Sequence, residues 1–335
     1  MLKRYFAIIC LGLTSFFYSQ LSLADTNFVD RPDVQSFINK MVVKHGFQQN
    51  QLVWLFNNVK IRPQVMRSIR APIEQQPWYD YQTIFITESR IREGVDFWNK
   101  HAATLAKAEK IYGVPASIIV ATIGVETKYG KNKGEYPVID ALTNIAFSNS
   151  PRAPFFRSEL EEFLLLVREQ HLNALTIKGS YAGAIGQPQF MPSSYRYYAV
   201  NFSGNGRIDL SNNVEDIIGS IANYYKKHGW KTNQPVAIPT RVAKNRYSRT
   251  LSEALLQAKV DKNHLAQYGI YPNQEPPSNQ ALKIIELQNH QGNEYWVGLH
   301  NFDVIKRYNP SNLYAMAVYQ LSYHIKDLRG RTHHG

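Results

Sequence analysis

The sequence has 335 residues, of which 44% are hydrophobic and 13% aromatic. This composition is typical of a globular protein with one large or two to three small domains, and it excludes an intrinsically disordered chain. The formal net charge is +12, and the basic residues are spread along the chain without forming runs. A basic protein favours anionic partners, and the spread of its charges argues against nucleic acid.

The first 24 residues have the pattern of a secretory signal peptide. Lys3 and Arg4 precede an apolar stretch over 5–17, and Ser22-Leu23-Ala24 places two small residues two positions apart. The stretch is too short for a stable membrane span, so we predict cleavage after Ala24 and a periplasmic protein. An uncleaved anchor, which would keep the protein membrane-associated, is the alternative.

Cys10 is the only cysteine of the chain. Lipidation of Cys10 is disfavoured because the bulky Ile9 stands where a lipidation site has a small residue. Cleavage after Ala24 would remove Cys10, so we expect neither a disulfide nor thiol chemistry in the mature chain.

Apolar residues at helical spacing dominate the rest of the chain and predict a mainly α fold. The segments expected to be helical are 32–60 with a break at Gly46, 87–112, 115–130, 140–147, 157–171, 214–228 and 312–328. Strand-like runs at 235–239, 281–287 and 294–299, with a short helix at 252–259, predict a small α+β domain. The expected order is a signal peptide (1–24), an N-terminal helical domain (25–100), a helical core (101–230), the α+β domain (231–300) and a segment returning to the core (301–335).

Glu126 stands at the end of an otherwise apolar predicted helix. Pro115 suits the first helical position and Gly130 the end. Ile119, Ile123 and Glu126 are spaced so that they share one helix face. Apolar surroundings raise the pKa of a carboxyl group, which could then act as a general acid near neutral pH. A solvent-facing glutamate is the alternative.

Other catalytic signatures are absent from the sequence. It contains no nucleophile elbow, no zinc-protease motif and no phosphate-binding loop, and its ten histidines have no metal-ligand spacing. Glycoside cleavage needs only carboxylates, commonly two. The nearest second candidates, Glu135 and Asp140, are better explained as a loop residue and a helix cap.

Several motifs follow one another in a fixed order. They are Gly-Val-Glu-Thr-Lys-Tyr-Gly at 124–130, Lys-Gly-Ser-Tyr-Ala-Gly-Ala-Ile-Gly at 178–186, Gln-Phe-Met-Pro-Ser-Ser-Tyr at 189–195, Asn-Phe-Ser-Gly-Asn-Gly at 201–206, Ile-Ala-Asn-Tyr at 221–224 with His-Gly-Trp at 228–230, and 307–317. In this order they resemble the B-type lytic murein transglycosylases, and the resemblance covers residues from about 28 to 325.

The resemblance implies a goose-lysozyme-like, mainly helical core that cuts the MurNAc–GlcNAc β-1,4 bond of peptidoglycan with one glutamate and no required cofactor. Glu126 matches that glutamate. It would protonate the glycosidic oxygen and then accept the proton of the C6 hydroxyl of the same muramic residue, while the N-acetyl oxygen of the substrate replaces a second carboxylate. The product would be a 1,6-anhydro sugar.

The resemblance also implies roles for other residues. Ser180 and Gln189 would orient the N-acetyl group and the acid, and Tyr224 would place a hydroxyl in the cleft. Arg152 suits the peptide or lactyl carboxylate, although the family often has two adjacent arginines where this chain has Pro151-Arg152. Positions matching sugar contacts are Tyr81, Phe190, Tyr308, Asn309 and Tyr314. Core packing is the alternative role for Phe190 and Tyr314. It is equally the alternative for Tyr308, because the chain contains 21 tyrosines.

The motif at 201–206 has oxygen side chains at positions 1, 3 and 5 and glycine at 6, like the first half of a calcium loop. Two asparagines replace aspartates of the family, which lowers ligand charge and affinity. The closing acid, Glu215 or Asp216, lies beyond the usual twelfth position. The expected ligands of a structural calcium are Asn201, Ser203, Asn205, Arg207 and Asp216, and a plain Asn-Gly turn is the alternative.

The sequence therefore favours an exported lytic transglycosylase that acts as a monomer on peptidoglycan glycan strands in cell-wall turnover, alongside proteins of cell-wall synthesis or hydrolysis. A hydrolytic muramidase on the same fold and a noncatalytic peptidoglycan-binding protein are the alternatives.

Overall fold

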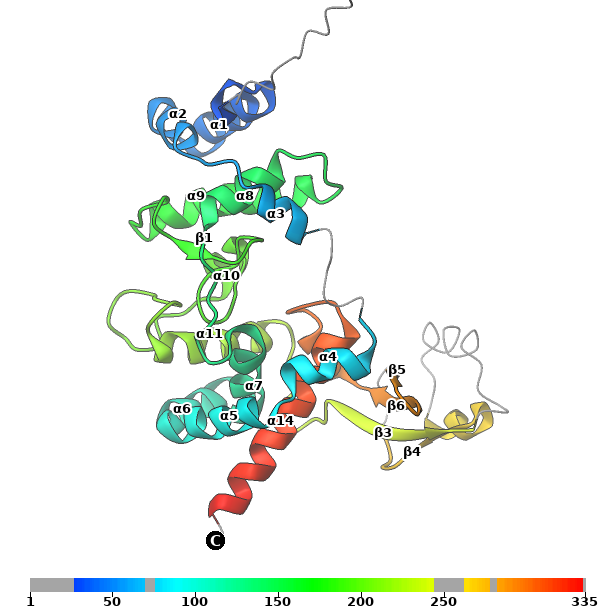
Figure 1. Ribbon diagram of the computed structural model, residues 1–335. Coiled ribbons are helices and arrows are strands. Elements are labelled where there is room, and N and C mark those ends of the chain that lie inside the picture. The colour runs from blue at the N-terminus through cyan, green and yellow to red at the C-terminus, as the bar shows by residue number, and fades with distance from the viewer. Residues whose placement is uncertain (1–26, 70–75, 244–261, 278–281, 334–335) are drawn as a thin grey trace, which may run out of the picture. The chain divides into compact units, whose positions relative to one another are not determined.

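The computed structural model describes residues 27–69, 76–243, 262–277 and 282–333 (Figure 1). The predicted signal peptide, Cys10 and the predicted helix at 252–259 lie outside these residues. The chain divides into two compact units, Met1–Asn58 and Val59–Gly335. This division falls inside the predicted N-terminal helical domain (25–100), and the other domain boundaries stay predictions.

Helices make up most of the described residues, as the periodicity predicted. They are η1 (Phe28–Asp30), α1 (Pro32–His45), α2 (Gln49–Asn57), α3 (Pro63–Ser68), α4 (Trp78–Phe85), α5 (Glu88–Lys100), α6 (Ala102–Tyr112), α7 (Ala116–Thr127), α8 (Val138–Ala146), α9 (Ala153–Glu169), α10 (Pro192–Tyr198), α11 (Val214–Lys227), η3 (Lys262–Tyr268), α13 (His300–Ile305) and α14 (Asn312–His333). The mainly α fold class is confirmed.

The first unit contains α1 and α2. Pro32 begins α1, and Gly46, with a φ of 66°, ends it where the sequence predicted a break. The buried rings of Phe37 and Phe56 meet edge to face at 6.1 Å and join the two helices. This unit therefore has apolar packing of its own.

The predicted single helix over 87–112 is two helices. α5 ends and α6 begins at His101, whose backbone leaves the helical region with φ −117° and ψ 26°. The ring of Phe97 packs on that of His101 at 4.7 Å. The break occurs at a single residue that is neither Gly nor Pro, and the apolar periodicity continues across it. The sequence therefore predicted one helix. No single helix among the described residues is long and apolar enough to cross a membrane, and α6 with α7 meets the length and composition test only as a pair bent by 113°.

Two antiparallel sheets accompany the helices. A two-stranded sheet pairs β1 (Tyr136–Pro137) with β2 (Lys178–Gly179), and a four-stranded sheet has the order β4-β3-β6-β5. The strands of the larger sheet are β3 (Ala237–Val242), β4 (Ile270–Pro272), β5 (Lys283–Asn289) and β6 (Gly292–Gly298). The three strand-like runs of the sequence correspond to β3, β5 and β6, whereas the three-residue β4 was not predicted.

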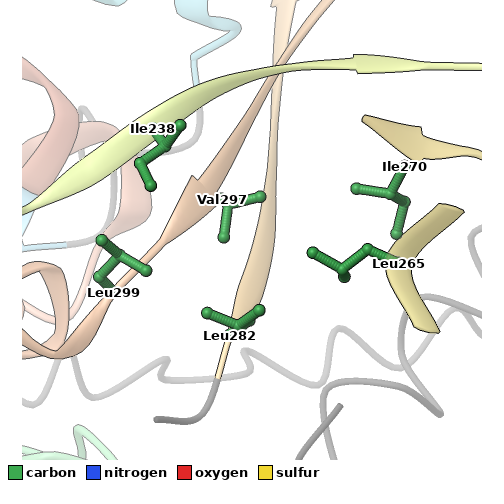
Figure 2. Packing of buried hydrophobic residues seen from close by; sticks show 6 residues of the cluster. All are labelled: Ile238, Leu265, Ile270, Leu282, Val297 and Leu299. Atoms are coloured by element: carbon green, nitrogen blue, oxygen red, sulfur yellow. The ribbon is translucent and has the colours of Figure 1, made fainter. Parts of the chain in front are cut away.

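The larger sheet has its own apolar cluster. Figure 2 shows its side chains converging beside β3 and β6; the cluster comprises Ile238, Leu265, Ile270, Leu282, Val297 and Leu299. At the start of α13, the fully buried Asn301 donates hydrogen bonds to the carbonyls of Lys231 and Gln234, both at 2.9 Å. This side chain fixes the entry to the sheet region.

The centre of the second unit is α7, which is apolar and buried on all sides up to Val125. α14, the last helix of the chain, packs against α7, α5 and α4. The C-terminal helix therefore lies against the helix that carries Glu126.

Candidate active site

Glu126 lies on the last turn of α7, and its side chain is partly exposed, whereas Ile119 and Ile123 of the same face are fully buried. The helix begins one residue later than predicted, because Pro115 is its N-cap. It also ends earlier than Gly130, at Lys128 with a φ of 48°. The carboxyl group is thus placed where the apolar helix reaches solvent.

Three consecutive residues after the helix adopt left-handed backbone conformations. Lys128, Tyr129 and Gly130 have φ values of 48°, 57° and 84°. For the two residues with side chains this conformation costs energy, about 1–3 kcal/mol each, and persists only where surrounding contacts impose it. Such contacts must therefore hold the turn that follows Glu126.

Tyr129 and Thr127 supply these contacts. The Tyr129 hydroxyl donates to the carbonyl of Arg90 at 2.8 Å. Its ring fills space left by Gly94 and Gly124, since a Cβ at either glycine would lie 2.6 Å from the hydroxyl oxygen. The Thr127 hydroxyl donates to the carbonyl of Gln187 at 3.0 Å. Sequence reasoning missed both positioning residues, although the motif at 124–130 contains them.

Tyr314 on α14 contacts the carboxyl group directly. Its hydroxyl donates to Glu126 Oε1 at 2.5 Å, and its side chain is 4% exposed. Burial, and then the nearby charge of Glu126, hold the pKa of Tyr314 well above its usual value. The hydroxyl therefore keeps its proton and remains a donor to Glu126. The predicted sugar contact of Tyr314 stays a prediction.

Tyr314 belongs to an aromatic cluster that also contains Phe190, Tyr224 and Tyr308. The ring of Tyr308 stacks on that of Tyr314 with centroids 6.3 Å apart, and it lies 4.8 Å from Tyr224 and 5.7 Å from Phe190. Burial raises the pKa values of Tyr224 and Tyr308, so both hydroxyls stay protonated.

Hydrogen bonds tie this cluster to neighbouring backbone. Tyr308 donates to the carbonyl of Pro188, and Tyr224 to that of Arg307, both at 2.6 Å. Phe190 is only 2% exposed. In this arrangement core packing accounts for the place of Phe190, and sugar contact by Phe190, Tyr224 and Tyr308 stays a prediction.

The loop at 180–190 is braced by the two polar residues singled out in the sequence. The Ser180 hydroxyl oxygen accepts from the backbone N–H groups of Ala182 (3.2 Å) and Ala184 (3.1 Å). Gln189 has a φ of 49°, and its Nε2 donates to the carbonyls of Gly186 (2.8 Å) and Lys133 (3.1 Å). Gln189 thus links this loop to the segment that follows Glu126.

The remaining predicted contacts are less closely connected to Glu126. Tyr81 is buried in α4, 1% exposed, with its ring 4.9 Å from that of Phe85. Arg152 is exposed at the start of α9, and its guanidinium lies 5.1 Å from the ring of Phe156. Asn309 accepts from the N–H of Ser311 at 3.1 Å. Their roles toward a substrate stay predictions.

The two other acids considered as partners of Glu126 serve different purposes. The prediction that Asp140 caps a helix is wrong. Its carboxylate accepts from the N–H of Lys60 (3.0 Å) and from the Arg62 guanidinium (2.9 Å). This buried side chain lies within α8, where it anchors the segment before α3. Glu135 is exposed. Neither observation supplies a second catalytic carboxylate.

The predicted calcium loop is held by its own hydrogen bonds. The fully buried Asp216 accepts from the N–H of Ser203 (3.0 Å) on Oδ1 and from the N–H of Asp209 (3.1 Å) on Oδ2. Asn205 Oδ1 accepts from the N–H of Arg207 (2.9 Å), and Asn201 Oδ1 from the Ser203 hydroxyl (3.2 Å). Within the described ranges no group of three or more Asp, Glu, His or Cys side chains could hold a metal ion. Among the predicted ligands only Asp216 is a carboxylate, and Asp209, which was not predicted, adds a second one within the loop that backbone N–H groups already bind. This low ligand charge predicts weak affinity for a divalent cation.

A mainly helical fold that holds one partly exposed glutamate against a tyrosine hydroxyl fits the lysozyme-like class of glycan-cleaving enzymes, and the comparisons with known proteins assign the chain to that class. Residues 30–323 match the family described as the Transglycosylase SLT domain. The chain is 42% identical to the membrane-bound lytic murein transglycosylase B of Escherichia coli strain K12 over 305 residues. The aligned region covers 88% of this chain and 83% of that protein. The chain belongs to this transglycosylase family.

Solved structures agree with this assignment and confirm the predicted lysozyme-like helical fold. The soluble lytic transglycosylase SltB1 from Pseudomonas aeruginosa is 46% identical, with a TM-score of 0.81 over 89% of this chain and 100% of that one. The Escherichia coli lytic transglycosylase Slt35 in complex with calcium is 40% identical, with a TM-score of 0.82 over 90% and 95%. SltB3 from Pseudomonas aeruginosa, in complex with NAG-NAM-pentapeptide, is 28% identical, with a TM-score of 0.77 over 90% and 80%.

Proposed function

We propose that this protein is a lytic murein transglycosylase in which Glu126 is the only catalytic carboxyl group. Glu126 donates a proton to the glycosidic oxygen between MurNAc and GlcNAc, and that bond breaks. The N-acetyl oxygen of the same MurNAc stabilises the positive charge that develops at C1. The C6 hydroxyl then attacks C1 and gives its proton back to Glu126, so the product is a 1,6-anhydro sugar and no water is consumed.

The hydrogen bond from Tyr314 to Glu126 is the observation that carries this proposal. A donor at 2.5 Å fixes the orientation of the carboxyl group at the exposed end of α7, from which it can exchange a proton with the substrate. Gln189 and Thr127 hold the loop beside it. Ser180 and Gln189 would orient the N-acetyl group, and Arg152 would meet a carboxylate of the substrate.

A hydrolytic muramidase is the second candidate. It would need a positioned water and commonly a second carboxylate as base. Asp140, the buried acid that the sequence offered, is bound to Lys60 and Arg62. Because these hydrogen bonds occupy the Asp140 carboxylate, it is not available as a base, which favours the non-hydrolytic route.

The test is the variant Glu126→Gln, incubated with purified sacculi. The amide keeps the shape of the side chain but cannot donate a proton and recover it, so we expect release of muropeptides to stop while binding to sacculi continues. Full activity of the variant would refute the assignment of Glu126.

We further propose that the protein is exported to the periplasm and acts as a monomer on glycan strands, near other proteins of cell-wall turnover. The signal-peptide pattern of residues 1–24 supports export, and the membrane-bound relative from Escherichia coli keeps membrane association as the alternative. No cofactor enters the proposed reaction. At 201–216 we propose weak calcium binding at most, because Asp216 already closes the loop through backbone hydrogen bonds.

A further inference from the structure

A second concave site lies beside the loop that carries Ser180. Its cavity of about 490 Å³ is within the range of small-molecule pockets, about 300–1,000 Å³. The apolar part of its lining comprises Leu166, Leu172, Ile177, Ile185 and Ile208. None of these residues belongs to the aromatic cluster around Glu126.

The charged lining of this pocket is mainly positive. Lys133, Lys178 and Arg207 contribute to it, and Asp209 is the single acid among the lining residues. The Asp209 carboxylate is bound by backbone, accepting from the N–H groups of Ser211 (2.8 Å) and Asn212 (3.0 Å). Lys178 and Arg207 are exposed. The pocket therefore favours a ligand with carboxylate groups and small apolar side chains.

Two residues join the pocket to the active-site loop. The backbone carbonyl of Lys133 accepts from Gln189 Nε2 at 3.1 Å, while its Nζ donates to the carbonyl of Ser211 at 3.1 Å. The next residue, Gly134, packs so closely that a Cβ there would lie 2.1 Å from the carbonyl oxygen of Gly179 and 2.5 Å from the N of Ser180. The wall of the pocket thus touches the loop that would orient the sugar.

We propose that this pocket binds the carboxylate-bearing part of the peptidoglycan stem peptide while the glycan lies at Glu126. An extended peptide of five residues spans about 17 Å, and the pocket adjoins Ser180 through the close approach of its lining residue Gly134. Its carboxylates would pair with Lys178 and Arg207, and its methyl groups would contact the Leu and Ile side chains. This assignment rests on the proposed function, and it differs from the peptide contact expected of Arg152, which does not line the pocket.

The experiment compares two substrates. Glycan strands with intact stem peptides and the same strands freed of peptides by an amidase are digested with wild type, Lys178→Gln, Arg207→Gln and the double variant. Each single variant should be about three- to fivefold slower on peptide-bearing strands, as expected for one partly exposed ion pair, and the double variant about tenfold slower. Rates on peptide-free strands should equal those of wild type. Lys110→Gln, which removes an exposed charge of α6, is the matched control and should lose nothing on either substrate.

Equal rates of wild type and double variant on both substrates would overturn the assignment of the pocket and leave the proposed function intact. An equal loss on both substrates would also overturn it, because the residues would then act on the loop and not on the peptide. If wild type cleaves neither substrate, the proposed function fails, and the pocket is tested separately by calorimetric titration of the full-length protein with a soluble stem pentapeptide. The pentapeptide should bind the double variant more weakly than wild type. The assignment would be refuted if wild type did not bind the pentapeptide, or if inorganic phosphate alone competed with the pentapeptide at equal strength.

Discussion

Tyr314→Phe removes one hydroxyl group from the active site and leaves the ring in place. The lost interaction is the 2.5 Å hydrogen bond to Glu126 Oε1. Because Tyr314 is 4% exposed and its ring stacks on that of Tyr308, phenylalanine should keep the packing of α14. The substitution therefore isolates the donor that holds the carboxyl group.

The expected size follows from the charge of the acceptor. A hydrogen bond to a charged group contributes about 1.5–3 kcal/mol, which corresponds to a loss of cleavage rate of about 10- to 100-fold if the bond is needed in the transition state. Glu126 is partly exposed, so water can replace the donor in the resting enzyme, and the free energy of unfolding should change by less than about 1 kcal/mol.

The assay is the initial rate of muropeptide release from sacculi, with thermal unfolding of each variant as the measure of stability. Tyr225→Phe is the control, since its hydroxyl is fully buried and meets the hydroxyl of Thr122 at 2.9 Å. It should lose about 1 kcal/mol of stability and little activity. A Tyr314→Phe enzyme with the wild-type rate would refute the positioning role of this hydroxyl.

Three further predictions concern the loop, the metal and the tyrosines. Ser180→Ala and Gln189→Ala should keep part of the cleavage rate on sacculi, because each residue orients the reaction without carrying its protons; complete loss in either would contradict this. Millimolar calcium, compared with a chelator, should raise Tm by less than about 2 °C, and a shift above about 5 °C would show that the loop at 201–216 binds the ion tightly. Burial raises the pKa of Tyr195 to about 12 and those of Tyr308 and Tyr314 well above the usual value. Their contribution to the free energy of unfolding is fully present below a pH of about 10. It is lost as pH rises through the pKa of the folded protein, because the same tyrosines ionise at lower pH in the unfolded chain. In an alkaline ultraviolet titration these groups should ionise only together with loss of circular dichroism, and ionisation of all tyrosines near pH of about 10 in the folded protein would be the contrary result.

Sequence patterns predicted most helices because burial of one face leaves a visible period. Gly46, with its positive φ, marked a helix end correctly. The break at His101 and the early end of α7 at Lys128 could not be predicted in this way, because no Gly or Pro stands at either position. The backbone there is imposed by contacts from elsewhere in the fold, such as that of Tyr129 with Arg90.

The candidate site shows the same limit. The position of Glu126 at the end of an apolar helix could be predicted from the sequence, whereas its catalytic role stays a proposal. The hydrogen bond from Tyr314 to Glu126 could not be predicted. The two residues are 188 positions apart, and a tyrosine hydroxyl has no local sequence signal for its partner. For the same reason Asp140 looked like a helix cap, although its partners are Lys60 and Arg62.

The central claim, cleavage by Glu126 without water, is tested most directly by the mass of the products. Sacculi digested with the wild-type enzyme should release muropeptides that end in 1,6-anhydromuramic acid, one water lighter than the corresponding reducing sugars, and digestion with Glu126→Gln should release none. Reducing-end muropeptides from the wild type would contradict the account and identify a hydrolase.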